Sequence, residues 1–180
     1  MTRKILFISL ALLLVIGISS ADFSSQPKPK KKTSKKTTEK KPEAKAETQH
    51  RGIVWYNMTE GFAKAKKENK ILVVDVYTDW CGWCKVMDKQ TYENANVVQK
   101  MKKYFVGVKF NPEVNASYTV NDQVLNSDQL AKYLNKGGRI PGYPMTYVWK
   151  NLSDNSKIEP YSGYLDTTVF NTIMNKAIQN

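Results

Sequence analysis

The chain has 180 residues, a formal net charge of +12 and only two cysteines, Cys81 and Cys84. Two cysteines form at most one disulfide, so this is not a small disulfide-stabilised scaffold, and its length suffices for one hydrophobic core. More than half of the net positive charge lies in the first 50 residues, which argues against a nucleic-acid-binding groove in the rest.

The N-terminus begins with Met-Thr-Arg-Lys, continues as an apolar run from Ile5 to Ile18 and then has small residues up to Ala21. This order is typical of a secretory signal peptide, so residues 1–21 are predicted to be one, cleaved after Ala21. The apolar run is shorter than the ~20 residues that a membrane-spanning helix needs. The prediction is a periplasmic or secreted protein, with an uncleaved membrane anchor as the alternative.

Residues 22–50 form a lysine-rich segment. Between Ser24 and Gln49 it contains nine lysines and three prolines but no aromatic or branched aliphatic residue. Such a segment cannot bury enough apolar surface to offset the entropy of ordering, so we expect a disordered linker. Its lysines either contact an anionic surface or solvate a spacer. Residues 51–180 are then predicted to form a single domain.

The first half of this domain alternates between helical and extended patterns. A helix is expected to begin at Asn57 or Thr59 and to end near Asn69, before a buried strand over residues 71–77. Helical spacing is predicted from Gly82 to about residue 90 and again after residue 96, followed by a strand over residues 105–110. The polar residues 111–126 are predicted to be irregular.

The second half begins with a helix that Ser127 or Asp128 caps and that ends at Gly137-Gly138. Residues 145–150 and 157–161 are predicted to form a hairpin, and a closing helix follows Asp166. This order predicts an α/β three-layer sandwich in which helices flank a mixed β-sheet.

Both cysteines lie in the stretch TDWCGWCK, where a strand ends and a helix begins. A structural zinc site needs four ligands, and the single histidine, His50, lies in the linker, so no metal site is predicted. Covalent haem attachment needs a histidine after the second cysteine, where this chain has Lys85. A disulfide across Gly82 and Trp83 closes too short a loop to add much stability. A redox role without metal or organic cofactor is therefore expected.

Cys81 is expected to be the nucleophile because it lies at the start of a helix. The unpaired backbone N–H groups and the helix dipole there stabilise a thiolate, which is the attacking species. Cys84 lies one turn later, where it can attack a mixed disulfide and release the substrate. Asp75 interrupts an apolar strand, where burial would raise its pKa and allow proton exchange with Cys84. An acid on an edge strand is the alternative.

The segment ILVVDVYTDWCGWCK resembles the thioredoxin-fold family, in which a buried acid lies six residues before the first cysteine of a Trp-Cys-x-x-Cys-Lys motif. Similar features further along are Lys109 on the next strand, a Gly-Tyr-Pro loop that ends at Pro144, and Gly163 before the last helix. The chain is similar above all to the thioredoxin-like domains of secreted thiol:disulfide interchange proteins, whose phrase K-x-M-x-x-x-T-[FY] occurs after the cysteines.

This resemblance implies roles for residues outside the cysteine pair. Lys109 would act beside Asp75, and Pro144 would be a cis-proline that faces the cysteines. Tyr143 would offer backbone groups to the substrate or merely pack. A further group is predicted to bind substrate around Cys81 or to lie partly in the core: Trp80, Gly82 and Trp83.

The sequence departs from thioredoxin at three places, one of which is Met145, where thioredoxins commonly have threonine. Trp83 occupies the position of thioredoxin's proline between the cysteines, so the resemblance does not imply a reduction potential. The segment from Asn111 to Pro144 is longer than the family's equivalent, and its extra residues form either a substrate-recognition flap or a surface loop.

The predicted function is that of an exported thiol:disulfide oxidoreductase that exchanges disulfides with extracytoplasmic proteins and acts as a reductant. Its electrons would come from a membrane donor or leave to an oxidant. A monomer is expected, and the absence of a dimerisation domain argues against a disulfide isomerase. The alternative is a thioredoxin-fold binding or chaperone-like module that holds partners without redox turnover.

Overall fold

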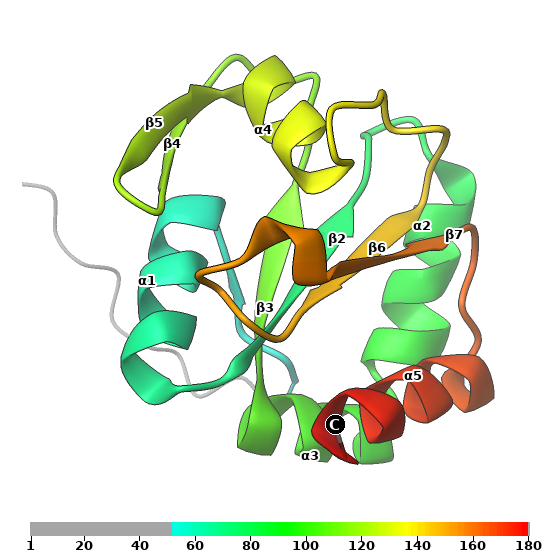
Figure 1. Cartoon of the computed structure of the whole chain (residues 1–180). Helices are drawn as coiled ribbons and strands as arrows, with labels where there is room; N and C mark the ends of the chain where they lie inside the picture. Colours follow the sequence, from blue (N-terminus) through cyan, green and yellow to red (C-terminus); the bar gives the residue numbers. More distant parts are fainter. Residues whose placement is uncertain (1–51, 180) are drawn as a thin grey trace, which may run out of the picture. The chain divides into compact units, whose positions relative to one another are not determined.

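A computed structural model describes residues 52–179 (Figure 1), so the predicted signal peptide and linker lie outside the described residues. One mixed sheet has the strand order β1-β3-β2-β6-β7. Its strands are β1 (Trp55–Tyr56), β2 (Ile71–Val76), β3 (Phe105–Phe110), β6 (Met145–Trp149) and β7 (Ile158–Ser162). The first three run parallel, whereas β6 and β7 are antiparallel to their neighbours.

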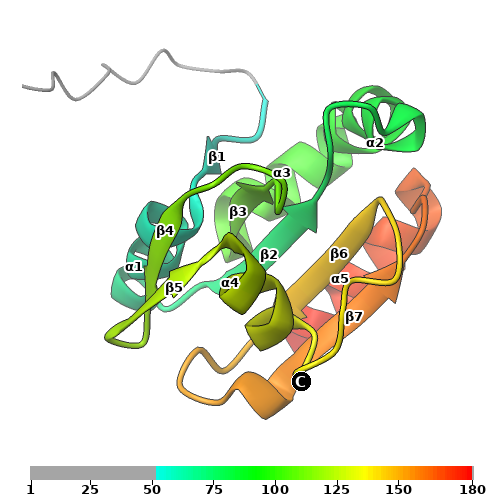
Figure 2. The same ribbon diagram turned by 90° about the horizontal axis from the view of Figure 1, so that it is seen from above.

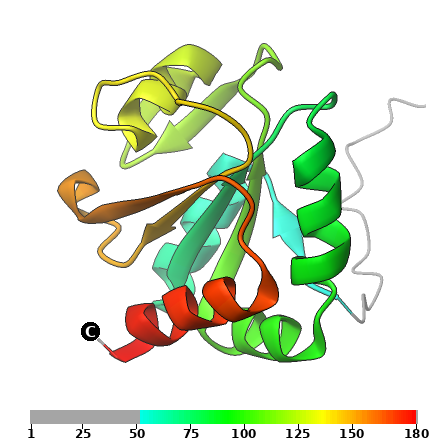
Figure 3. The ribbon, with the colours of Figure 1, turned by 90° about the vertical axis from the view of Figure 1, so that its right-hand side faces the viewer.

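Helices cover both faces of this sheet (Figure 2). They are α1 (Met58–Glu68), α2 (Gly82–Met87), α3 (Ala95–Tyr104), α4 (Ser127–Leu134) and α5 (Thr167–Gln179). Alternate residues of a strand point to opposite faces, so Val74 packs with α1 and α4 in one core, and Val73 packs with α3 and α5 in another. The two helices of the second core, α3 and α5, lie side by side (Figure 3). The predicted three-layer sandwich is confirmed.

The helix ends show which polar residues act as caps. Asn57 caps α1 by accepting a hydrogen bond from the Glu60 N–H, as predicted. The cap of α4 is Asn126, not Ser127 or Asp128, because Asn126 and Gln129 form a reciprocal capping box. Ser127 is already helical, and its hydroxyl donates instead to the Val114 carbonyl.

The helix after the cysteines continues further than predicted and changes its winding. The α-helix α2 ends at Met87, and the segment η1 (Asp88–Tyr92) is a π-helix. The Thr91 hydroxyl within it donates to the Leu165 carbonyl at 2.7 Å, which ties this segment to the chain before α5. Single π-turns inside helices are frequent at functional sites, and this one follows the cysteine pair directly.

The segment predicted to be irregular contains a hairpin of its own, so that prediction is wrong. Strands β4 (Ser117–Val120) and β5 (Gln123–Asn126) pair antiparallel in a separate small sheet. Asn121 and Asp122 turn the chain with φ angles of 47° and 62°, a conformation that Asn and Asp tolerate. Most residues of the two strands are exposed. The strands therefore lack the run of apolar residues by which a buried strand is predicted from sequence.

The hairpin is anchored to the domain at two points. The Tyr118 ring packs edge-on against Phe110, with ring centroids 5.5 Å apart. The Thr119 N–H donates to the Thr59 hydroxyl of α1 at 2.9 Å. The hairpin therefore belongs to the layer that contains α1 and α4, on the face of the sheet opposite η1 and α3. Within residues 52–179, no helix is both long and apolar enough to cross a membrane.

Candidate redox site

The two cysteines form a disulfide where β2 leads into α2. Cys81 is the N-terminal cap of α2, and its sulfur is bonded to that of Cys84 at 2.06 Å. The Cys84 backbone N–H donates to the Cys81 sulfur at 3.1 Å, so the helix start presents a donor to that sulfur. Both residues are buried. The sequence placed the pair correctly at a strand-to-helix junction.

Four aromatic residues, Trp80, Trp83, Tyr143 and Tyr164, form what we call the aromatic surface beside the disulfide. Trp80 and Trp83 expose 67% and 62% of their surface, so neither is part of the core. The rings pair across the site, with 5.7 Å between the centroids of Trp80 and Tyr143 and 5.5 Å between those of Trp83 and Tyr164. Gly82, between the cysteines, is exposed as well.

A cleft of about 240 Å³ opens within this surface, lined by Trp83, Tyr143, Pro144, Gly163 and Tyr164. The peptide bond between Tyr143 and Pro144 is cis, as predicted. The Gly163 N–H donates to the Pro144 carbonyl at 2.9 Å, and a φ of 83° at this position favours glycine. The predicted Tyr143 and Pro144 therefore lie at the same cleft as Trp83.

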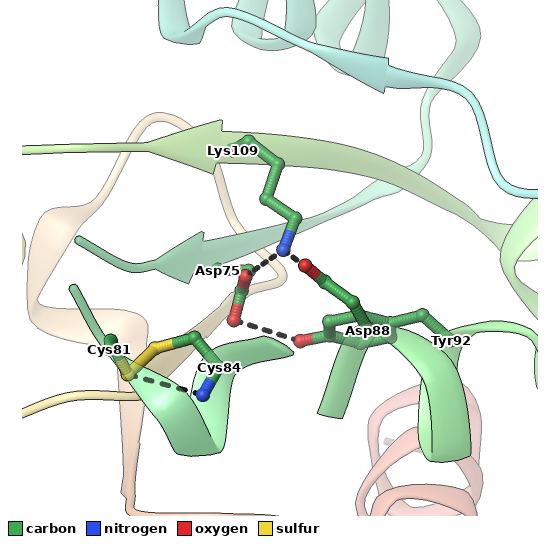
Figure 4. A network of polar contacts seen from close by, with 6 residues as sticks. All are labelled: Asp75, Cys81, Cys84, Asp88, Tyr92 and Lys109. Atoms are coloured by element: carbon green, nitrogen blue, oxygen red, sulfur yellow. Dashed lines mark hydrogen bonds and ion pairs between the residues drawn. A yellow bond between two sulfur atoms is a disulfide. The ribbon is translucent and has the colours of Figure 1, made fainter. Parts of the chain in front are cut away.

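Behind the disulfide, four charged or phenolic side chains form a connected network (Figure 4). Asp75 is 1% exposed, and its Oδ2 accepts a hydrogen bond from the Lys109 Nζ at 2.5 Å. The same ammonium group pairs with Asp88. The Tyr92 hydroxyl donates to the other Asp75 oxygen, Oδ1, at 3.0 Å. Two strands, β2 and β3, and the π-helix η1 thus contribute to one polar cluster, in which Asp75 and Tyr92 are buried and Asp88 is half-exposed.

Strand geometry explains why Asp75 and Lys109 meet under the disulfide. The parallel register places Asp75 directly beside Lys109. Asp75 also shares a sheet face with Val73, which packs against Met87 and Tyr92 in the core below the cysteines. The carboxylate therefore faces the layer that carries the disulfide, and it is not the acid of an exposed edge strand.

Burial and charge shift the pKa values of this network in opposing ways. Burial raises the pKa of Asp75, and the adjacent Lys109 ammonium opposes that rise without cancelling it. Burial lowers the pKa of Lys109, but the carboxylates of Asp75 and Asp88 outweigh it, so that pKa is raised. A buried carboxyl with a raised pKa takes up a proton more readily than an exposed one, as a proton acceptor in catalysis must.

Sequence reasoning missed several residues of this site. Asp88 was read only as part of a helix, and Tyr92 only as the last position of the family phrase after the cysteines, without a role in the site. Glu113 was also missed, and its carboxylate accepts the Trp80 indole N–H at 3.1 Å. Among residues 52–179, no three His, Cys, Asp or Glu side chains are grouped as metal ligands would be.

Comparison with protein families gives one family model, Thioredox_DsbH, described as "Protein of unknown function, DUF255", which matches residues 36–160. Spermatogenesis-associated protein 20 of Rattus norvegicus is 30% identical over 142 residues, covering 76% of this chain and 16% of that protein. Its counterpart in Homo sapiens is 32% identical over 114 residues, covering 61% and 12% respectively. The chain therefore spans less than a fifth of the length of these relatives.

Two solved structures are similar in fold. A thioredoxin from Thermus thermophilus has a TM-score of 0.52 at 16% identity, covering 71% of this chain and 88% of its own. A thioredoxin-fold protein from Helicobacter pylori has a TM-score of 0.50 at 14% identity, covering 65% and 80% respectively. At these identities the likeness shows a shared fold.

Proposed function

The chain belongs to the thioredoxin-like family that the DUF255 model describes, and we propose that it is an exported thiol–disulfide oxidoreductase that reduces disulfides of extracytoplasmic proteins. The fold together with the C-x-x-C pair at disulfide distance supports thiol–disulfide exchange in general. One observation carries the finer proposal. The Cys81–Cys84 disulfide lies between an exposed aromatic surface and a buried carboxyl with a raised pKa.

The exchange proceeds in two steps. The Cys81 thiolate attacks one sulfur of a substrate disulfide, so that the other substrate sulfur leaves with its electron pair and takes a proton from water. The Cys84 thiol then gives its proton to Asp75 and attacks the Cys81 sulfur, which forms the Cys81–Cys84 disulfide and releases the second substrate thiolate. Two electrons have moved to the substrate, and a dithiol donor must replace them before the next turnover.

The proposed direction of electron flow is supported by the absence of a charged residue between the cysteines, which leaves the helix start as the source of thiolate stabilisation at Cys81. Strong oxidants of this fold owe their potential to a stabilised reduced form. Here Gly82 and Trp83, between the cysteines, carry no charge, and Cys84 is buried. Both features limit the stabilisation of the reduced pair beyond what the helix start gives to Cys81, and this supports a reductant.

Export and partners complete the proposal and are supported by the N-terminal sequence alone. The signal-like residues 1–21 would direct export, and the lysine-rich residues 22–50 would hold the domain near an anionic membrane surface. The proposed partners are a membrane electron donor and extracytoplasmic proteins with disulfides. The protein would act as a monomer and would need neither metal nor organic cofactor.

Thiol exchange is tested by incubating the purified protein with a disulfide-containing protein and a dithiol donor. Wild type should turn over, and Cys81→Ser and Cys84→Ser should not. Only Cys84→Ser should accumulate a mixed disulfide, because its attacking sulfur is intact and its resolving sulfur is missing. Wild type that exchanges with no dithiol or disulfide would contradict the proposal.

The direction of electron flow is tested by the reduction potential of the pair in equilibrium with glutathione. The proposal predicts a potential nearer to the about −270 mV of thioredoxin than to the about −120 mV of DsbA. A potential near the DsbA value would show that the protein oxidises its substrates.

The exposed indoles of Trp80 and Trp83 favour a second candidate, a binding module that holds unfolded partners. The variant with both cysteines replaced by serine separates the two. If it protects a reduced client protein from aggregation as well as wild type does, and wild type shows no turnover, binding is the function. If turnover is present in wild type and lost in this variant, the oxidoreductase stands.

A further inference from the structure

Tyr92 is a buried phenol where a phenylalanine would fill the same space. Its ring packs edge-on against Trp55 and Phe170, with centroids 4.7 and 5.4 Å away, and only 4% of the residue is exposed. These contacts hold the ring from two sides and so fix the position of its hydroxyl. That hydroxyl donates to the Asp75 Oδ1 (Figure 4). The polar atom of Tyr92 therefore serves Asp75 and is not needed for packing.

Thr146 is the second unusual hydroxyl at this place. It lies on β6, directly opposite Asp75 in the antiparallel register with β2, and it is fully buried. Among residues 52–179, its oxygen meets no partner with full hydrogen-bond geometry. Burial raises the pKa of Tyr92, and a hydrogen-bonding contact from the Thr146 hydroxyl lowers it, so the two hydroxyl groups lie within reach of each other although their contact falls short of full hydrogen-bond geometry. A buried hydroxyl without a partner is costly, so its presence beside Tyr92 calls for an explanation.

The two protonation states of Asp75 explain why a second hydroxyl lies beside Tyr92. The ionised carboxylate accepts hydrogen bonds from Lys109 on Oδ2 and from Tyr92 on Oδ1. Once Asp75 has taken a proton on Oδ1, it needs an acceptor there instead of a donor. The Tyr92 oxygen becomes that acceptor if its own hydrogen turns away, and the unpaired Thr146 oxygen is available to receive it.

We infer that Tyr92 and Thr146 form a hydroxyl switch that keeps Asp75 hydrogen-bonded both before and after it accepts the Cys84 proton. The inference rests on the proposed thiol exchange, which assigns that proton to Asp75. No bond to sulfur is made or broken by the switch itself. One proton arrives on Asp75, and the Tyr92 hydroxyl reverses its direction. Tyr92 and Thr146 are positioning residues because they act through Asp75.

The other titratable groups that face Asp75 come from three elements and stay in place in the variants used below. Lys109 lies on β3, Asp88 on η1 and Cys84 on α2. Lys109 bonds the oxygen that Tyr92 does not, so removing the phenolic hydroxyl leaves that ion pair intact.

The switch predicts pH shifts of opposite sign for two substitutions. Tyr92→Phe removes both the donor to the ionised carboxylate and the acceptor for the protonated form. Because a hydrogen bond to a charged group is about twice as strong as one to a neutral group, the ionised form loses more, and the Asp75 titration midpoint should rise by about one pH unit. Thr146→Val removes the acceptor needed by the protonated state, so the midpoint should fall by up to about one pH unit. In the double variant the Thr146→Val effect should vanish, because no phenolic hydrogen remains for Thr146 to accept.

The titration is measured by ¹³C NMR of the Asp75 carboxyl carbon in the oxidised full chain, where the cysteines do not titrate. The matched control is Tyr161→Phe, which removes a phenol that donates to the Glu159 carboxylate at 2.6 Å on β7. It should leave the Asp75 midpoint unchanged. In the reduced protein, the acid limb of the rate at which Cys84 resolves a mixed disulfide should shift in step with the NMR midpoint.

Two results would overturn the switch. One is an Asp75 midpoint that Tyr92→Phe does not move, and the other is a shift of the same sign for Tyr92→Phe and Thr146→Val. Its failure is distinguishable from that of the proposed function. If the NMR midpoints shift as expected while wild type exchanges no disulfides, the hydroxyl switch is supported and the proposed oxidoreductase function is refuted.

Discussion

Replacing Lys109 by Met should destabilise the protein at neutral pH far more than the loss of an ordinary surface ion pair. The Lys109 Nζ lies 2.5 Å from the Asp75 Oδ2, and these side chains are only 20% and 2% exposed. Removing one partner of a buried pair leaves an uncompensated charge and costs about 3–5 kcal/mol. Because Asp75 can respond by taking a proton, we expect about 3 kcal/mol, the lower end of that range.

The loss should depend on pH with a definite sign. Burial has already raised the pKa of Asp75 in the folded protein, and without the Lys109 ammonium this pKa rises further. A carboxyl with a raised folded pKa favours folding below its unfolded pKa of about 3.9, and this contribution is lost as the pH rises through the folded pKa. The deficit of Lys109→Met should therefore be small near pH 4 and grow towards neutral pH.

Urea unfolding at pH 4 and pH 7 measures this deficit in a double-mutant cycle of Lys109→Met and Asp75→Asn. The control is Lys132→Met, whose partner Asp128 lies four residues earlier on α4, with the two side chains 51% and 73% exposed. This control should lose less than about 1 kcal/mol at either pH. An equal loss for Lys109→Met at both pH values, or no coupling to Asp75→Asn, would show that Lys109 contributes only the packing of its apolar stem.

Three further substitutions test the fold and the aromatic surface. A Cβ at position 61 would lie 2.2 Å from the Val108 Cγ2, so Gly61→Ala should lower stability by about 1–3 kcal/mol in urea unfolding, whereas a gain would contradict the packing described. Asn126→Ala should lower the free energy of unfolding by about 1 kcal/mol because it removes the α4 cap. The control Asp128→Ala should change it by less than about 0.5 kcal/mol. A larger loss for Asp128→Ala than for Asn126→Ala would show that Asp128 is the cap. Trp83→Ala should raise KM for a protein disulfide several-fold and leave the unfolding midpoint unchanged, because Trp83 lines the cleft. An unchanged KM would show that the cleft does not bind the substrate.

The elements that were predicted well are those whose signal is local. An almost continuous apolar run marks β2, and helical spacing with a polar cap marks α1, so both appear near their predicted bounds. The cysteine pair lies at the junction that these local patterns define. The errors lie where a local pattern competes with distant contacts. The hairpin of β4 and β5 shows polar faces, and its anchors, Phe110 and Thr59, lie elsewhere in the chain.

The residues of the candidate site also fall into two groups: those predicted from one local segment, and those that contacts between distant segments bring together. The two cysteines of the disulfide and the buried acid were readable from one continuous segment, because the strand, turn and helix that position them are consecutive. Trp80 and Trp83 were assigned to that segment too, but only the packed domain shows that both are exposed. Glu113 could not be assigned, since its partner Trp80 lies 33 residues away.

By itself, the sequence determined the redox chemistry of this protein, because two cysteines without further ligands at the start of a helix leave few other uses. It also determined the order of helices and strands, since backbone periodicity is a property of consecutive residues. Only the tertiary structure decided what surrounds Asp75. Strand register sets Lys109 and Thr146 on either side of it, and the π-helix brings Tyr92 to its second oxygen. These contacts depend on how separate segments pack, and no local pattern encodes them.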